Sequence, residues 1–291
     1  MDSFSISQLE KFSGIKSHTI RIWEKRYNAL EPDRSEGNTR HYSGAQLRRL
    51  LNIVSLMGSD HKISEICGLG DKELFRLVDK RKEAATDDLD NYFITQLISA
   101  GLNFEEAAFN GLFSHCLLRY GMKETYTRIL YPLLVQTGDL WACNVMAPAH
   151  EHFLMNLVRQ KLNTAIDLLP PPTKDERWML MLPENEFHES GLLLAHYLIR
   201  LSGRKVIYLG ANMPTSSVLP AIESIKPDKL LIFLVHREAP EHAQQYLNKI
   251  AGWFKGKRIY VAANKEIVGK MKTNKKMEWL ESVSSLETIL H

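Results

Sequence analysis

The strongest constraint on the fold is a change in hydrophobic periodicity near residue 170. Before that point, apolar residues recur at spacings of three and four, which predicts amphipathic helices. After it, short apolar runs alternate with helical segments, and the runs are 177–182, 205–210, 229–235 and 258–263. Apolar strands separated by helices predict a parallel sheet covered on both faces, and such sheets bind ligands beyond the carboxyl ends of their strands.

Two connectors divide the chain into predicted domains. The charged stretch 79–88 lacks apolar periodicity, and the consecutive prolines in 170–176 cannot continue a helix. We therefore predict a helix-turn-helix domain at 1–75, a four-helix bundle at 89–169 and a doubly wound, Rossmann-like parallel-sheet domain at 176–291. The predicted fold class is multidomain, with α and α/β parts.

Composition places the chain among ordinary globular proteins, with 44% hydrophobic and 24% charged residues. It shows no signal-peptide pattern and no apolar run of the roughly 18 to 20 residues that span a bilayer, so we expect a cytoplasmic protein with no membrane partner. Cys67, Cys116 and Cys143 are too far apart for a disulfide framework or a zinc site. We expect them to be reduced, partly buried thiols.

A local excess of positive charge marks the N-terminal region. Residues 11–50 contain nine basic and four acidic side chains, although the net charge of the whole chain is only +3. The pattern predicts two helices joined by a turn at Gly14, with Ser5 or Ser7 capping the first helix and Ser17 the second. In such a motif the opening turns of the second helix face the major groove of DNA.

The segment after the second helix predicts a wing. Its Pro, Gly and Asn residues favour a turn, and the sequence TRHY predicts a short hairpin arm before a new helix near Ser43. This layout resembles the winged helix-turn-helix of the MerR family, with its Arg-x-Tyr element at Arg40 to Tyr42, over roughly residues 4–70. The resemblance implies double-stranded DNA as a partner. The predicted DNA contacts are Lys16, His18, Thr19, Arg21, Arg26, Arg34, Arg40 and Tyr42.

Simpler interpretations exist for the same residues. Trp23 and Ile20 recur at helical spacing, which favours a place in the domain core. The basic residues could form only a solvated surface. For the arginines we favour DNA contact, because several cations cluster where the motif predicts phosphates.

The later 200 residues resemble the cobalamin-binding module of methionine synthase and of light-sensing MerR regulators of the CarH type. One shared motif is Trp-x(9)-Glu-His, matched by Trp141, Glu151 and His152. Pro148 suits the first turn of the helix that carries the Glu-His pair, so Trp141 precedes that helix. The resemblance implies that Trp141 covers the upper face of the corrin and that the Glu-His pair helps to close the cap.

A second shared motif is Glu/Asp-x-His-x-x-Gly, matched by Glu186, His188 and Gly191. The resemblance implies that His188 is the lower axial ligand of cobalt. Glu186 is placed to fix its tautomer, and Gly191 lets the backbone approach a bulky ligand. Alone, His188 could be an exposed loop histidine. Its occurrence together with the Trp141 motif favours cobalt ligation.

Three residues depart from the family pattern. The resemblance implies a slot for the nucleotide tail of cobalamin, lined by a Ser on the third strand and a Gly-Gly pair after the fourth. Here these positions are Phe233, Ala262 and Ala263, which all add volume to a tightly packed interior. Either the slot rearranges and cobalamin still binds, or the domain keeps its fold without the ligand.

We therefore expect a DNA-binding transcription regulator, in particular a repressor, that acts as a homo-oligomer in the cytoplasm, associated with the nucleoid. Its expected cofactor is cobalamin, specifically adenosylcobalamin, and the resemblance implies that light dissociates the DNA-binding oligomer. The alternative is a DNA-binding regulator whose ligand-free cobalamin-type domain serves oligomerisation or protein interaction. An enzyme subunit is disfavoured, because the sequence predicts no additional catalytic domain.

Overall fold

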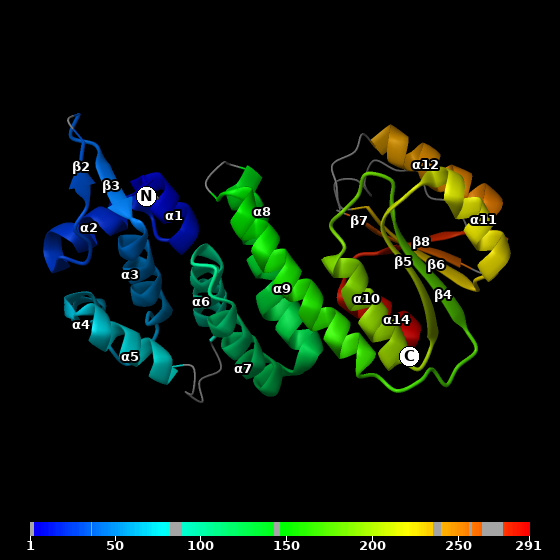
Figure 1. Cartoon of the computed structure of the whole chain (residues 1–291), viewed down its shortest axis with the longest axis horizontal. Helices are drawn as coiled ribbons and strands as arrows, with labels where there is room; N and C mark the ends of the chain where they lie inside the picture. Colours follow the sequence, from blue (N-terminus) through cyan, green and yellow to red (C-terminus); the bar gives the residue numbers. More distant parts are fainter. Residues whose placement is uncertain are drawn as a thin grey trace. The chain divides into compact units, whose positions relative to one another are not determined.

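The computed structural model divides into two compact units, Met1–Leu157 and Val158–His291. Figure 1 shows the elements of each unit. The division falls inside one long helix, so the helix-turn-helix region and most of the helical region share the first unit. The structure describes residues 3–35, 37–81, 89–142, 146–234, 240–255, 258–263 and 276–291.

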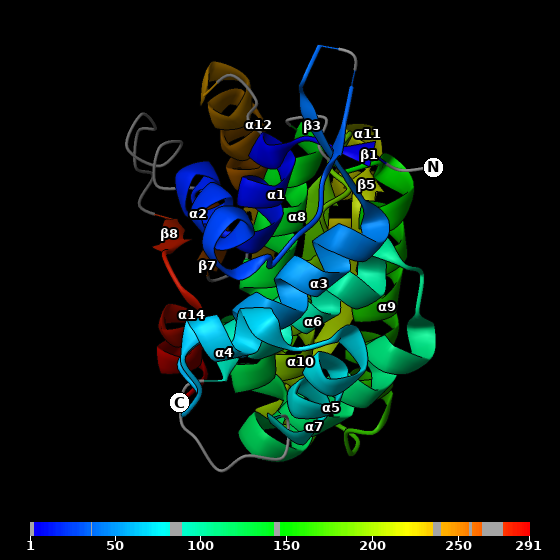
Figure 2. The same ribbon diagram turned by 90° about the vertical axis from the view of Figure 1, so that its left-hand side faces the viewer.

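The first unit begins with a small three-stranded sheet among short helices. Strand β3 pairs antiparallel with both β1 and β2, and Figures 1 and 2 show the β2–β3 hairpin projecting from the helices. This arrangement confirms the predicted wing. The elements are β1 (Ser3–Phe4), α1 (Ile6–Ser13), α2 (Ser17–Tyr27), β2 (Asp33–Arg34), β3 (Arg40–Ser43), α3 (Gly44–Ser55), α4 (Ile63–Gly68) and α5 (Asp71–Arg81).

Local signals explain the first helices. Ser5 caps α1, because its hydroxyl accepts from the N–H of Gln8 at 3.3 Å while the Gln8 side chain accepts from the N–H of Ser5 at 2.8 Å. Gly14 ends α1 at a φ of 72°, a left-handed conformation that glycine adopts without strain. Ile20 and Trp23 are buried, which confirms their predicted place in the core.

The predicted cap of α2 is wrong. Lys16 holds the cap position, and Ser17 is the first helical residue. The hydroxyl and N–H of Ser17 donate to the carboxylate of Glu10 on α1, at 2.6 and 2.9 Å. These hydrogen bonds lower the pKa of Glu10 to about 2. The start of α2 is therefore satisfied by a side chain from the neighbouring helix.

Helices complete the first unit, in the region where the sequence predicts a four-helix bundle. They are α6 (Asp90–Leu102), α7 (Glu106–Glu124), the π-helix η1 (Thr125–Leu130), α8 (Tyr131–Ala142) and α9 (Pro148–Asp167), whose later part belongs to the second unit. Gly121 interrupts α7 at a φ of 71°. The linker predicted at 79–88 is wrong at its start, because α5 continues to Arg81, and 82–88 lie outside the described residues.

Helix α6 is held on two sides. The amide of Gln96 donates to the side-chain oxygens of Asn52 and Ser55 on α3, at 3.1 and 2.8 Å, and both of these α3 residues are buried. On α9, Leu154 packs against the bare backbone of Gly101. A Cβ atom at Gly101 would lie 2.6 Å from two carbon atoms of Leu154, so this close approach requires glycine.

The second unit is a parallel five-stranded sheet with helices on both faces. Its strand order is β5-β4-β6-β7-β8. Helices α10 and α14 cover one face, and α11 and α12 cover the other (Figure 1). The elements are β4 (Arg177–Pro183), α10 (Ser190–Leu201), β5 (Lys205–Met213), α11 (Thr215–Ile225), β6 (Lys229–Leu234), α12 (Pro240–Trp253), β7 (Arg258–Ala263), β8 (Met277–Leu280) and α14 (Val283–Leu290).

The predicted fold class is confirmed in this unit. All of the predicted strands are present, and the proline-rich connector 170–176 forms neither helix nor strand. The edge strand β8 was not predicted, because its four residues are too few to give a clear pattern. Within the described ranges, no helix is long and apolar enough to cross a membrane.

The cysteines behave as buried thiols where they are described. Cys67 and Cys116 are free and buried. Burial raises the pKa of Cys67 to about 11 and that of Cys116 to about 12. Cys143 lies outside the described residues.

Candidate functional site

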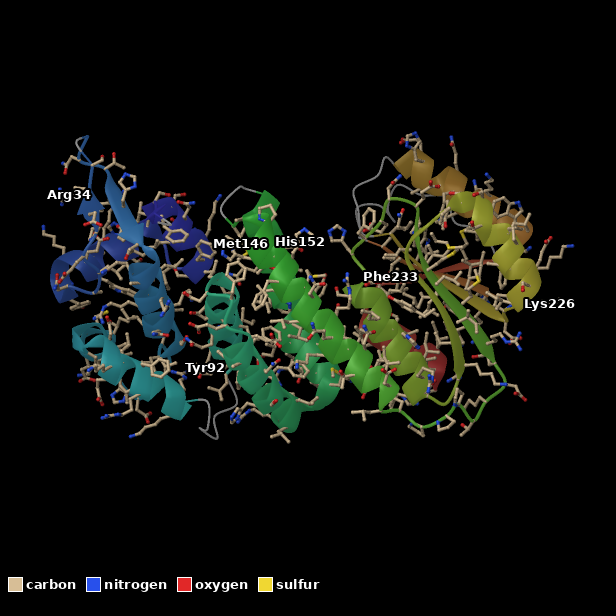
Figure 3. The ribbon with its side chains drawn as sticks, viewed as in Figure 1. Arg34, Tyr92, Met146, His152, Lys226 and Phe233 are labelled. Carbon is tan, nitrogen blue, oxygen red and sulfur yellow. The ribbon has the colours of Figure 1, made fainter. Side chains whose placement is uncertain are left out.

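The predicted DNA contacts lie on α2 and the wing. Lys16 is exposed at the N-cap of α2. His18, Arg21 and Arg26 are exposed along the helix, and Thr19 is half-buried among them. Arg34 is exposed on β2, where its guanidinium donates to Asn38 at 2.6 Å (Figure 3). The fold therefore presents cations on both parts of a winged helix-turn-helix.

Glu24 on α2 fixes the wing to that helix. Its carboxylate accepts from Nε of Arg40 at 3.1 Å and from the hydroxyl of Tyr42. Tyr42 is only 1% exposed, and burial, followed by the bond to Glu24, raises its pKa. This place does not agree with the predicted phosphate contact of Tyr42, because its hydroxyl is held inside the domain. Arg40 is half-buried and paired with Glu24.

Arg49 is another basic residue that serves the fold. Its guanidinium donates to the backbone oxygens of Ala29, Cys67 and Leu69 at 2.7, 2.9 and 2.8 Å, and it pairs with Asp71. It therefore joins α3 to three separate segments of the domain. Arg49 is one of the nine basic residues of 11–50, and charge alone does not distinguish an internal cation from an external one.

Two substitutions are expected to separate base reading from phosphate binding. Arg21→Ala should weaken binding to the specific operator by about 1–3 kcal/mol and change binding to unrelated DNA much less. Arg34→Ala should weaken both and reduce the slope of log affinity against log salt by about 1. Fluorescence anisotropy over a salt series measures both effects. Arg76→Ala, an exposed residue of α5, is the control, and an equal loss from it would contradict the assignment.

The Trp-Glu-His motif spans two helices of the first unit. Trp141 lies near the end of α8, and its side chain is outside the described part of the structure. Pro148 begins α9, as predicted, so Glu151 and His152 lie in the opening turns of that helix. Glu151 is half-buried and His152 is exposed. The neighbouring His150 stacks on Phe104, with ring centroids 4.6 Å apart.

The Glu-His pair of the second unit lies directly after β4. Glu186 is 5% exposed, and one of its carboxylate oxygens lies 2.7 Å from Nδ1 of His188. The same oxygen accepts from the N–H groups of Phe187 and His188 at 2.9 and 3.0 Å. His188 is exposed. A buried acceptor with several donors holds its position well, so Glu186 orients the ring and favours a proton on Nδ1.

The sequence did not indicate how firmly this loop is held. Asn212, at the end of β5, accepts from the N–H of Asn185 at 2.8 Å and donates its own N–H to the carbonyl of Glu186 at 2.9 Å. Both asparagines have positive φ, which Asn tolerates better than most residues. In the sequence, the two Asn residues alone indicate turns at these positions. That Asn212 binds Asn185 depends on β5 lying beside β4, which the sequence does not show.

A second carboxylate adjoins His188. Glu189 accepts from the hydroxyl of Tyr208 on β5 at 3.1 Å and forms an ion pair with Arg159 on the later part of α9, at 2.6 Å. Burial and the nearby Glu189 raise the pKa of Tyr208. This contact connects the His188 loop to α9 within the second unit. It was not predicted, because it joins residues far apart in the sequence.

Phe233 contacts the chain just after the His188 loop, at Gly191 in the first turn of α10. It is half-buried near the end of β6, and Figure 3 labels it beside the start of α10. A Cβ atom at Gly191 would lie 2.8 Å from Cε1 and 3.3 Å from Cδ1 of this ring. The space over Gly191 is therefore filled by Phe233, and Ala262 is paired beside it on β7.

Family models match both functional regions. Residues 4–71 match the MerR HTH family regulatory protein, and residues 94–165 match the B12 binding domain. The fold and the site thus define a class of protein in which a MerR-type DNA-binding domain is joined to a B12-binding module.

Two relatives align with most of the chain. The HTH-type transcriptional repressor CarA of Myxococcus xanthus is 27% identical over 81% of this chain and 78% of its own. The repressor CarH of the same organism is 23% identical over 85% of this chain and 84% of its own. The chain is homologous to both repressors at modest identity.

A solved structure supports the fold alone. The monomethylamine corrinoid protein of Methanosarcina barkeri aligns with a TM-score of 0.54 at 12% identity, over 69% of this chain and 98% of that protein. This likeness confirms the predicted Rossmann-like fold.

The residues present fit the cobalt of a cobalamin but do not fit its nucleotide tail. The Glu186–His188 pair suits a cobalt ligand, because a ring with its proton on Nδ1 carries its lone pair on Nε2. The tail side does not fit, because the ring of Phe233 fills the space over Gly191. Within the described ranges, no cluster of three or more His, Cys, Asp or Glu side chains could hold a metal ion.

Proposed function

We propose that this protein is a transcriptional repressor that binds double-stranded DNA and is controlled by a cobalamin-type corrinoid. The observation that carries the proposal is the buried carboxylate of Glu186, 2.7 Å from Nδ1 of His188 at the carboxyl end of β4. The exposed cations of α2 and the wing support the DNA-binding part. The similarity to two repressors supports the regulatory part.

The proposal gives each candidate residue a role. His188 would be the ligand that holds cobalt, and the contact of Glu186 with Nδ1 would fix the tautomer and orientation of its imidazole. Trp141, Glu151 and His152 contact the upper side of the corrin, as the resemblance implies. When bound, adenosylcobalamin supplies a cobalt centre whose upper ligand is removed by light. The light response depends on the resemblance to the CarH-type regulators.

The proposal extends to assembly and place of action. We expect a homo-oligomer without catalytic activity that acts in the cytoplasm, on the DNA of the nucleoid. An oligomer with two DNA-binding domains binds repeated half-sites, and their spacing reports the symmetry of the assembly.

Reconstitution in the dark tests the ligand assignment. The full chain is mixed with excess adenosylcobalamin, separated from free ligand, and its visible absorption spectrum is recorded before and after illumination. We expect coloured protein, a spectrum that differs from free adenosylcobalamin because imidazole has become the lower ligand, and DNA binding that changes on illumination. Glu186→Gln should weaken binding about tenfold or more, since it loosens the support of the ligating ring.

His188→Ala is the decisive variant. It should lose the imidazole-bound spectrum, whereas His242→Ala, which removes an exposed histidine of α12, should keep it. An unchanged spectrum in His188→Ala would exclude His188 as the ligand. Colourless wild-type protein would contradict cobalamin control.

A second candidate function is favoured by Phe233. If the ring over Gly191 excludes every corrinoid, the second unit serves oligomerisation or binds a partner protein. Wild-type protein would then bind DNA and remain colourless. Restoring small residues with Phe233→Ser, Ala262→Gly and Ala263→Gly would create binding that the parent lacks.

A further inference from the structure

The order of the strands identifies where a ligand of the second unit binds. The chain passes from β4 to β5 on one side of β4, and then to β6 on its other side. In open parallel sheets, ligands bind beyond the carboxyl ends of the strands at the point where the order reverses. Here that point lies between β4 and β6. The His188 loop follows β4, and Phe233 lies near the end of β6.

The side chain of Phe233 points into the layer between the sheet and α10. Its neighbours Ile232 and Leu234 belong to the core on the other face of the sheet, with Val218 and Leu247. Because successive strand residues alternate between faces, Phe233 faces α10. Its contact with the backbone of Gly191 agrees with this direction. Phe233 thus contacts Gly191, which lies three residues after His188 in the chain.

Gly191 and Phe233 are complementary. Any side chain at Gly191 would meet the edge of the ring, with the first carbon 2.8 Å from Cε1. Glycine at this position therefore makes room for an aromatic residue of the protein itself. The resemblance implies that the nucleotide tail of a cobalamin would need this same space, so the ring would have to leave it before a base could enter.

Cobalamins carry a nucleotide that ends in a base, whereas cobinamides have the same corrin without that nucleotide. In free cobalamin the base itself binds cobalt, so a cobalt held by His188 would have to give up that base. A displaced base must be housed in the protein or left in water. A cobinamide has no such requirement.

We propose that Phe233 makes this a site for corrinoids without a lower nucleotide base, with His188 as the ligand and the Phe233 ring filling the place of the tail. The proposal rests on the proposed function and narrows its ligand class. Phe233 is the residue that would determine specificity, because its ring fills the space over Gly191.

Binding of two defined probes tests this specificity. The full chain is titrated in the dark with adenosylcobinamide and with adenosylcobalamin, and the dissociation constants are measured by equilibrium dialysis. Wild-type protein should bind the cobinamide about tenfold or more tightly than the cobalamin, the factor expected when a tail must displace a packed ring. Phe233→Ser should shift the ratio of the two constants toward cobalamin by about the same factor.

Two further variants support the comparison. Phe187→Ser removes an exposed aromatic residue beside His188 and should leave the ratio of the two constants unchanged. Gly191→Ala should lower the melting temperature of the wild-type protein and have little effect in a Phe233→Ser background, since the ring that it meets is then absent. The second comparison tests the packing without any ligand.

The outcomes separate this inference from the proposed function. Equal binding of both probes by wild-type protein and by Phe233→Ser would overturn the specificity and leave corrinoid control intact. Cobalamin binding by Phe233→Ser alone would overturn the inference and support a ligand-free parent. Failure of both proteins to bind either probe would overturn both proposals.

Discussion

Gly101→Ala is expected to lower the free energy of unfolding of the first unit by about 2–3 kcal/mol, because the added methyl overpacks a filled core. Its Cβ atom would lie 2.6 Å from two carbon atoms of Leu154, which is fully buried. Helices α6 and α9 would have to separate or Leu154 would have to leave its rotamer. Urea unfolding followed by amide hydrogen exchange in α6 measures the loss.

The same substitution elsewhere provides the control. A Cβ atom at Gly111, on α7, would meet no atom within 4 Å, so Gly111→Ala should stabilise its helix by about 0.5–1 kcal/mol. Leu154→Ala should reduce the cost of Gly101→Ala, since it removes the atoms that clash. Additive effects of the two changes would show that the contact is not the cause.

Arg49→Met is expected to destabilise the DNA-binding domain by about 3 kcal/mol or more, because several backbone oxygens lose a charged donor. The guanidinium has bonds to Ala29, Cys67 and Leu69, and no apolar side chain can replace them. Hydrogen exchange in residues 4–71 of the full chain measures the loss. At low temperature, where the domain stays folded, the free energy of DNA binding should change less than the free energy of unfolding.

Arg76→Met is the matched control. Arg76 is exposed on α5 and forms a surface ion pair with Glu73 at 3.1 Å, so its loss should change the free energy of unfolding by less than about 0.5 kcal/mol. Arg49→Lys keeps the charge and should recover part of the stability. Equal stability of Arg49→Met and Arg76→Met would contradict a structural role for Arg49.

Elements set by local pattern could be predicted from the sequence. The apolar runs predicted the strands β4 to β7 and their parallel direction, because strands buried on both faces of a sheet need continuous apolar residues. Gly14 was predicted to end α1 for similar local reasons, and Ser5 was one of the two serines, with Ser7, that the sequence offered as its cap. The crowding expected from Phe233 agrees with its position against Gly191.

Features that depend on distant residues could not be predicted. Ser17 is a residue type that commonly caps helices, but its hydroxyl donates to Glu10 on another helix. Tyr42 fits a family motif for DNA contact, yet Glu24 holds it in the core. In each case the sequence identified a suitable polar group and could not identify its partner. The roles of Trp141 and His188 as ligand contacts remain predictions.

The contact of Gln96 with α3 has a consequence for domain exchange. The buried side chains of Asn52 and Ser55 both accept hydrogen bonds from Gln96 on α6. Fusing residues 1–81 alone to an unrelated sensor domain would remove Gln96, and both side chains would lose this donor. A chimera would need either α6 itself or apolar replacements at both positions. The DNA-binding domain of this protein is therefore poorly suited to transfer by itself. A fusion to another sensor domain should begin after Leu102, where α6 ends.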